Sequence, residues 1–208
     1  MRPATRRAAL ALGLALAATG AWAAARAPIM APQPDDMAIG NPHARVTVVE
    51  YASVGCPHCA VWANTVWPAF KARWVDTGRV RFVVREMTTG EPTLAAAGFL
   101  TARCAGPAKY FHVIDEVFRR QASMFQPGVQ PSAILQDIAR DVGVTPAQFN
   151  ACLDDPAALD ALNARVARHV GVDKVDSTPT FVINGAVTVG EMTLDQLDAA
   201  IHAARRGR

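Results

Sequence analysis

Four short stretches of apolar and β-branched residues predict the strands of a sheet. Residues 45–51 carry apolar side chains on both parities, which is typical of a central strand covered on both faces. A second strand is expected at 79–85. Residues 180–183 and 186–189 are joined by Asn184-Gly185, the dipeptide that two-residue type I′ turns prefer. The last two strands should therefore form a hairpin.

The pattern after the first strand predicts a β-α-β unit. Pro57 is favoured in the first turn of a helix and Thr77-Gly78 supplies a stop, so a helix is expected from Pro57 to about Asp76. Pro68 lies inside this helix and should kink it. Strands connected in this way are parallel, with a right-handed crossover.

The middle of the chain has a helical pattern. Residues 92–172 are rich in Ala and Leu, with breaks at prolines and glycines, and they predict four or five helices. A last helix is expected from about Thr193 to Ala204, with Thr193 as its cap. The fold class is therefore α/β, a mixed central sheet flanked by helices and interrupted by an all-helical subdomain.

The first residues have the pattern of a cleavable export signal. A basic start, an apolar run and small residues before a cleavage site follow one another: Arg2, Arg6 and Arg7, then 8–18, then Ala21-Trp22-Ala23. The apolar run is shorter than the ~20 residues that span a bilayer, so cleavage after Ala23 is expected rather than a membrane anchor. The pattern leaves the Sec and twin-arginine routes open.

The predicted segments follow from these patterns. They are a signal peptide at 1–23, an extended Pro-rich arm at 24–43, a sheet-forming domain at 44–91 and 173–208, and a helical insertion at 92–172. The chain has 21 basic and 18 acidic residues, and removal of the three basic residues of the signal leaves a formal net charge of zero. A nucleic-acid partner is therefore not expected.

Cys56-Pro57-His58-Cys59 is the main candidate for chemistry. Two cysteines three positions apart, at the start of a helix and in an exported chain, favour a redox-active disulfide that needs no other cofactor. Unpaired backbone N–H groups and the helix dipole stabilise a thiolate at Cys56, and His58 adds hydrogen-bond donors. Cys56 should be the attacked sulfur, and Cys59, one turn further in, should resolve.

The ordered set of motifs resembles the DsbA-type thioredoxin-fold proteins. It comprises a strand ending in Glu50, the Cys56–Cys59 motif, Pro68, the helical insertion, and residues 177–181 before an Asn-Gly hairpin. The resemblance implies a thioredoxin fold and thiol:disulfide oxidoreduction in the periplasm, with reduced or unfolded exported proteins as substrates. It also implies re-oxidation by a quinone-linked membrane partner.

The resemblance also assigns roles to three residues outside the motif. Glu50 matches a buried acid that exchanges protons with Cys59. The apolar neighbours Val48, Val49 and Tyr51 favour this burial over the alternative, a strand-end carboxylate in solvent. Pro179 matches a cis-proline beside the disulfide. Thr178, before it, would present its backbone to an extended substrate peptide.

Cys104 and Cys152 both lie in the helical insertion. An even cysteine count in an exported chain favours a structural disulfide between them. Two buried free cysteines, or a second redox pair, are the alternatives.

The remaining histidines, the tryptophans and the N-terminal arm bear on the alternative functions. His43, His112, His169 and His202 lack metal-ligand spacing, so no metal site is expected, although two thiolates could still serve a copper-binding protein. Trp62, Trp67 and Trp74 lie along the predicted active-site helix, and packing is the favoured role for them. The alternative is an exposed Trp62 that lines an apolar substrate groove. A disulfide isomerase or reductase is the nearest alternative activity. The short arm argues against an oligomerisation module, so a monomeric oxidase is favoured.

Overall fold

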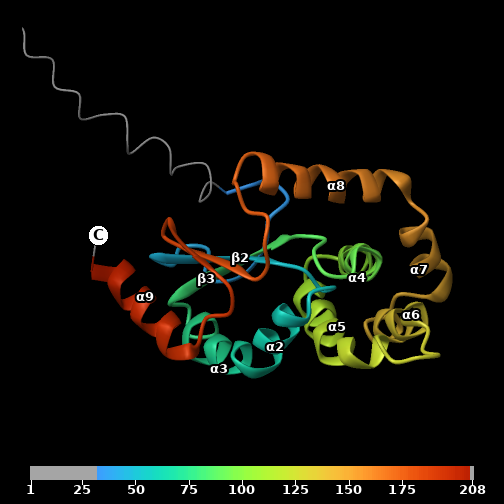
Figure 1. Cartoon of the computed structure of the whole chain (residues 1–208), viewed down its shortest axis with the longest axis horizontal. Helices are drawn as coiled ribbons and strands as arrows, with labels where there is room; N and C mark the ends of the chain where they lie inside the picture. Colours follow the sequence, from blue (N-terminus) through green and yellow to red (C-terminus); the bar gives the residue numbers. More distant parts are fainter. Residues whose placement is uncertain (1–31, 207–208) are drawn as a thin grey trace, which may run out of the picture.

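A five-stranded mixed sheet forms the centre of the protein (Figure 1). The computed structural model describes residues 32–206, and the predicted signal peptide lies outside them. The sheet order is β1-β3-β2-β4-β5, with β2 and β3 parallel and the other neighbours antiparallel. The strands are β1 (Met37–Gly40), β2 (Val46–Ala52), β3 (Val80–Glu86), β4 (Thr180–Ile183) and β5 (Ala186–Val189).

The parallel β2–β3 pair and the β4–β5 hairpin confirm the predicted strand arrangement. In the hairpin, Ile183 pairs with Ala186. Asn184 and Gly185 between them have φ values of 46° and 92°, and type I′ turns require positive φ at both positions.

β1 was not expected, because its segment was predicted to belong to an extended arm outside the sheet. Met37 and Ile39 pack against the core while the strand pairs with the edge of β3. Four residues between prolines give too short an alternation to indicate a strand from sequence.

The helices cover both faces of the sheet and extend it to one side. They are α2 (Pro57–Thr65), α3 (Trp67–Phe70), the π-helical segment η2 (Lys71–Val75), α4 (Pro92–Cys104), α5 (Tyr110–Met124), α6 (Pro131–Asp141), α7 (Pro146–Leu153), α8 (Pro156–Gly171) and α9 (Leu194–Arg206). In Figure 1, α8 lies on one face of the sheet, α2, α3 and α9 lie on the other, and α4 to α7 lie beside it. The five helices α4–α8 form the insertion between β3 and β4.

The helix predicted from Pro57 to Asp76 is three consecutive segments. α2 ends at Thr65 and α3 begins at Trp67, so the break precedes Pro68. Pro68 has no N–H to donate to the preceding turn, and the hydrogen-bond ladder is interrupted there. At the other end of the chain, Thr193 caps α9 as expected: its hydroxyl accepts from the backbone N–H of Gln196 at 3.3 Å.

Buried charged groups connect the insertion to the end of β3. Glu86 is 1 % exposed, and its carboxylate accepts from Arg103 Nε and Arg165 Nε, each at 2.7 Å, and from the Tyr110 hydroxyl at 2.9 Å. These three partners lie on α4, α8 and α5. A single strand-end carboxylate therefore holds three helices against the sheet.

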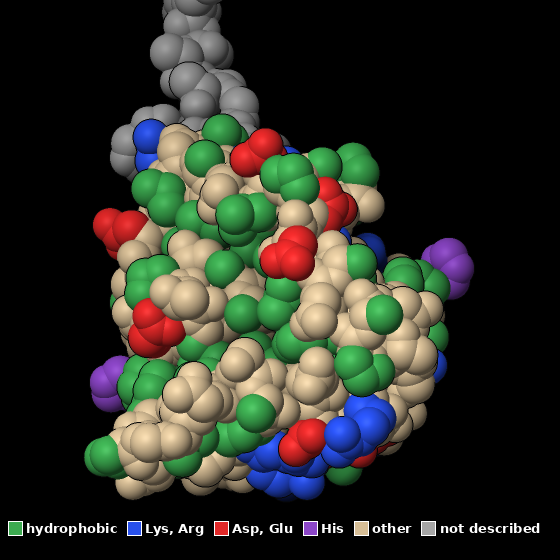
Figure 2. Space-filling model, turned by 90° about the vertical axis from the view of Figure 1, so that its right-hand side faces the viewer, with side chains coloured by type: hydrophobic (Ala, Val, Ile, Leu, Met, Phe, Trp, Pro, Cys, Tyr) green, Lys and Arg blue, Asp and Glu red, His purple; other side chains and the backbone are tan. Residues whose placement is uncertain are grey.

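The surface of the insertion is mixed in character. Figure 2 shows this end of the molecule: hydrophobic side chains are scattered among polar ones, and Lys and Arg side chains gather toward its lower edge. Among residues 32–206, no helix is both long enough and apolar enough to cross a membrane.

Candidate active site

Cys56 lies at the N-cap of α2, immediately before Pro57. Its backbone is extended, with φ −96° and ψ 122°, and its carbonyl accepts the first helical bond from Ala60 at 3.2 Å. The backbone N–H groups of the first helical turn therefore point toward its sulfur. The preceding Gly55 packs so closely on the Glu91 carbonyl that a Cβ would clash there. Glycine at this position lets the loop before Cys56 lie flat on the start of α4.

The surroundings of Cys56 favour its thiolate. Its pKa is lowered to about 5, first because the Cys59 side chain donates a hydrogen bond and then because Thr178 and the His58 and Cys59 amides add further bonds. Partial burial opposes this effect. The Cys56 Sγ also lies 3.5 Å from the carbonyl oxygen of Thr178, so the structure brings this predicted site residue against the outer sulfur.

Cys59 has the opposite character. It is completely buried, and burial raises its pKa far above the usual range for a thiol, while Cys56 and Glu50 raise it further. The backbone N–H of Ser53 donates to its sulfur at 3.5 Å. Both thiols are free in this structure. One sulfur of the motif is therefore stabilised as thiolate and the other as thiol.

His58 points away from the core and pairs with Glu191. Its Nδ1 lies 2.8 Å from Glu191 Oε1, and both side chains are exposed. Glu191 lies in the loop between β5 and α9. The pair therefore connects the first turn of α2 with that loop. The hydrogen bond and charge of Glu191 raise the pKa of His58.

Glu191→Gln is expected to lower the pKa of His58 toward its ordinary value, because the carboxylate that favours the imidazolium is removed. At pH values above that lowered pKa, His58 then becomes neutral. A titration of the His58 ring signals by NMR measures the shift. Asp137→Asn, an exposed aspartate paired with Arg140, is the control. Equal His58 midpoints in wild-type protein and Glu191→Gln would contradict the expectation.

Thr178 and Pro179 lie beside the motif, joined by a cis peptide bond. The Thr178 hydroxyl is hydrogen-bonded to the Thr89 hydroxyl. The Pro179 carbonyl accepts from Gly190 at 2.8 Å. The loop before β4 is thereby fixed to the loop after β3 and to the end of β5.

Glu50 is buried under the motif, on the face of the sheet that α2 covers. It is 3 % exposed, and burial raises its pKa to about 8, with smaller contributions from the charges of Asp115 and Cys56. Among the described residues, its Oε1 is the one buried side-chain nitrogen or oxygen without a hydrogen-bond partner. The interpretation of Glu50 as a solvent-exposed carboxylate is therefore wrong.

Gln121 is a residue of the site that the sequence did not indicate. It is buried on α5, and its Nε2 donates to the Val54 carbonyl at 2.7 Å and to the Cys56 carbonyl at 3.2 Å. It therefore fixes the loop that presents Cys56. A glutamine within an amphipathic helix carries no signal of such a role, because its partners are main-chain carbonyls 65 and 67 positions away.

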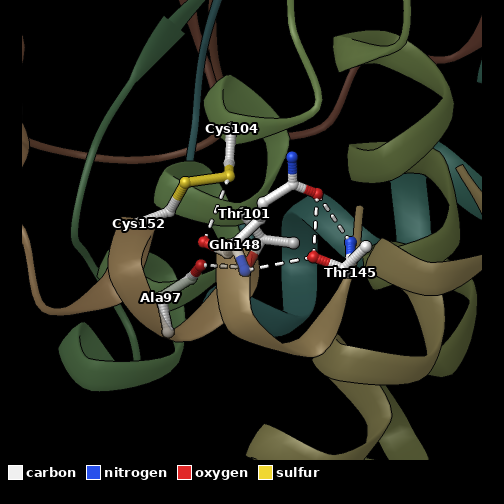
Figure 3. Close-up of a disulfide and its surroundings, with 6 residues drawn as sticks. All are labelled: Ala97, Thr101, Cys104, Thr145, Gln148 and Cys152. Atoms are coloured by element: carbon white, nitrogen blue, oxygen red, sulfur yellow. Dashed lines mark hydrogen bonds between the residues drawn. A yellow bond between two sulfur atoms is a disulfide. The ribbon is translucent and has the colours of Figure 1, made fainter. Parts of the chain in front are cut away.

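Cys104 and Cys152 form a disulfide between α4 and α7 (Figure 3). Their Cα atoms are 6.1 Å apart. The Thr145–Gln148 capping box that begins α7 lies directly beside the bond. Neither cysteine is among the free thiols, and the pair joins two helices of the insertion rather than the active site.

Trp62 packs in the core, as favoured for the tryptophans of this helix, and the alternative that it lines an exposed groove is wrong. It is 2 % exposed, its ring packs against Phe181, and its Nε1 donates to the Met192 carbonyl at 3.0 Å. Its neighbour Val61 is exposed instead. Within residues 32–206, no three His, Cys, Asp or Glu side chains are grouped to hold a metal ion.

The fold and the site together define a DsbA-type thioredoxin-fold protein, with a CxxC helix start facing a cis-proline and a helical insertion between β3 and β4. The chain belongs to the thioredoxin family, whose model matches residues 32–203.

The chain is also similar to individual known proteins in sequence and in structure. A Rickettsia bellii protein, provisionally named a protein-disulfide oxidoreductase, is 31 % identical over 170 residues, which are 82 % of this chain and 64 % of that protein. The chain thus spans less than two thirds of that relative's length. Disulfide bond formation protein D of Bacillus subtilis is 24 % identical over 82 % of this chain and 77 % of that protein. The structure of Wolbachia pipientis alpha-DsbA1 is 22 % identical, with a TM-score of 0.80, over 88 % of this chain and 96 % of that chain.

Proposed function

We propose that the protein is a thiol:disulfide oxidoreductase that oxidises dithiols of exported proteins through the Cys56–Cys59 disulfide. The observation that carries this proposal is the asymmetry of the two sulfurs. A thiolate with a pKa of about 5 lies beside the Thr178 backbone, and a buried thiol lies behind it. The names of the Rickettsia and Bacillus relatives support the same reaction class.

The reaction proceeds by two exchanges. A substrate thiolate attacks Cys56 Sγ in the oxidised protein, and the bonding electron pair leaves on Cys59 Sγ, which takes up a proton. A second substrate thiolate then attacks the substrate sulfur of the mixed disulfide and releases Cys56 as a thiolate. The substrate gains a disulfide and the protein becomes a dithiol, which a quinone-linked membrane partner would re-oxidise. No cofactor besides the disulfide is required.

The low pKa of Cys56 favours the oxidase over the reductase or isomerase. In the dithiol form the thiolate contributes stability that is fully present above pH 9, the ordinary pKa, and is lost as pH falls through about 5. The disulfide form has no such contribution. At pH 7 the Cys56 thiolate is favoured over the thiol about 100-fold. At ~30 mV per tenfold change in the equilibrium constant, this preference raises the reduction potential by about 60 mV.

We place the protein in the periplasm as a monomer, with residues 1–23 as its export signal. The signal pattern in the sequence and the reaction class support this location.

Equilibration with glutathione is expected to give a reduction potential above that of thioredoxin, about −270 mV. The protein is also expected to oxidise a dithiol peptide. It should refold little of a protein that carries scrambled disulfides. A potential at or below that of thioredoxin would favour the reductase. Stoichiometric copper in the purified protein, without dithiol turnover, would favour the metal-binding alternative.

A further inference from the structure

A small cavity lies between two carboxyl groups, Glu50 of β2 and Asp115 of α5. Its volume is about 10 Å³, at the lower limit of what one water molecule needs. The rest of its lining is aromatic or aliphatic, including Trp67, Phe111 and Phe118. The two carboxyl groups are therefore the charged groups at this cavity, and a water held there would have both within reach.

Glu50 has no direct route to solvent. Its side chain is buried, and its Oε1 has no hydrogen-bond partner among the described residues. On the motif side it interacts with the charges of Cys56 and Cys59, and on the cavity side with the charge of Asp115. Any proton that Glu50 gives to a sulfur must therefore be replaced through the groups on its cavity side.

Asp115 connects the cavity with the surface. Its side chain is partly exposed, and its Oδ2 accepts from Trp67 Nε1 at 3.3 Å. Three basic groups face it: Lys71 from η2, and His112 and Arg119 from α5. The second oxygen of Asp115, Oδ1, makes no hydrogen bond to any described residue. It is therefore available to a water or to Glu50.

We propose that Asp115 is the outer member of a two-carboxyl proton relay, which passes protons between solvent and Glu50 through the cavity. This proposal rests on the proposed function. When the Cys56–Cys59 bond opens, Glu50 gives its proton to Cys59 Sγ, and the resulting carboxylate is reprotonated through the cavity from Asp115, which recovers a proton from solvent. Re-oxidation reverses this path. Asp115 thus acts through Glu50 and touches neither sulfur.

Asp115→Asn tests the relay, because the amide oxygen still accepts from Trp67 while the charge and the acidic proton are removed. In the reduced protein, a ¹³C carboxyl titration should place the Glu50 midpoint about one pH unit below that of wild type, since a nearby like charge has gone. The rate of oxidation of a dithiol peptide, measured by stopped flow, should decrease at high pH. The pH midpoint of this decrease should be lower in Asp115→Asn than in wild type by the same amount. Asp115→Glu should restore both midpoints.

Two comparisons decide between a relay and a structural effect. In a Glu50→Gln background, Asp115→Asn should change the rate profile no further, because the group through which it acts is absent. Asp137→Asn, an exposed aspartate on α6, should leave both midpoints unchanged. A Glu50 midpoint unaffected by Asp115→Asn, or an equal slowing in the Glu50→Gln background, overturns the relay. A wild-type protein that does not oxidise the peptide refutes the proposed function, whereas the carboxyl titration still reports the coupling of Asp115 to Glu50.

Discussion

Cys56→Ser and Cys59→Ser are each expected to abolish oxidation of a dithiol peptide, because neither variant can form the Cys56–Cys59 disulfide that serves as the oxidant. When reduced Cys59→Ser is given a disulfide-bonded peptide instead, the Cys56 thiolate should attack one peptide sulfur and release the other as a thiolate. The reaction should then stop at the mixed disulfide, because the resolving thiol is absent. The thiolate is the attacking and leaving species in exchange, and at pH 7 a thiol with a pKa of about 5 is about 99 % ionised. A serine hydroxyl cannot replace it. Stopped-flow fluorescence measures the rate, and mass spectrometry of acid-quenched samples detects the mixed disulfide.

The control for this expectation uses the second cysteine pair. A Cys104→Ser, Cys152→Ser double variant removes two sulfurs from the insertion and leaves Cys56 and Cys59 in place. If Cys104–Cys152 is structural, the double variant should oxidise the peptide at the wild-type rate below its unfolding transition. Mixed disulfides on Cys59 rather than on Cys56 would reverse the roles assigned to the two sulfurs.

Local patterns predicted the elements of the fold well. The two-residue hairpin and the cap of α9 depend on neighbouring residues, and both form where the sequence indicates. β1 depends on the edge of β3, more than 40 positions away, and its own four residues are too few to indicate a strand. Elements that depend on distant partners are those that sequence patterns describe least well.

The candidate site shows the same division. The Cys56–Cys59 motif is contiguous and visible in the sequence, whereas Asp115 and Gln121 reach the site from α5 only after the insertion has packed. The packing role favoured for the tryptophans of this helix holds for Trp62. Its alternative place in an exposed groove could not be rejected from sequence, because the helix spacing does not say which aromatic face meets the sheet. Its indole N–H is satisfied by a carbonyl 130 positions away.

Glu86→Ala is expected to destabilise the protein by about 3–5 kcal/mol, because removal of one member of a buried ion cluster leaves the others uncompensated. Arg165 is the critical partner: its side chain is buried and its Nε donates to Glu86 at 2.7 Å. Urea denaturation of the oxidised protein measures the loss. Asp137→Asn, which breaks an exposed pair with Arg140, should cost less than about 1 kcal/mol.

A double-mutant cycle separates the cost of the stranded arginine from that of general loss of packing. Arg165→Ala in the Glu86→Ala background removes the buried charge that no longer has a partner. The double variant should therefore be less destabilised than the sum of the two single variants, by about 0.5–3 kcal/mol. Additive losses would show that the helices of the insertion are held by apolar packing alone. A large coupling would show that one carboxylate at the end of β3 fixes α8 on the sheet, and with it the position of the insertion that supplies Gln121 and Asp115 to the site.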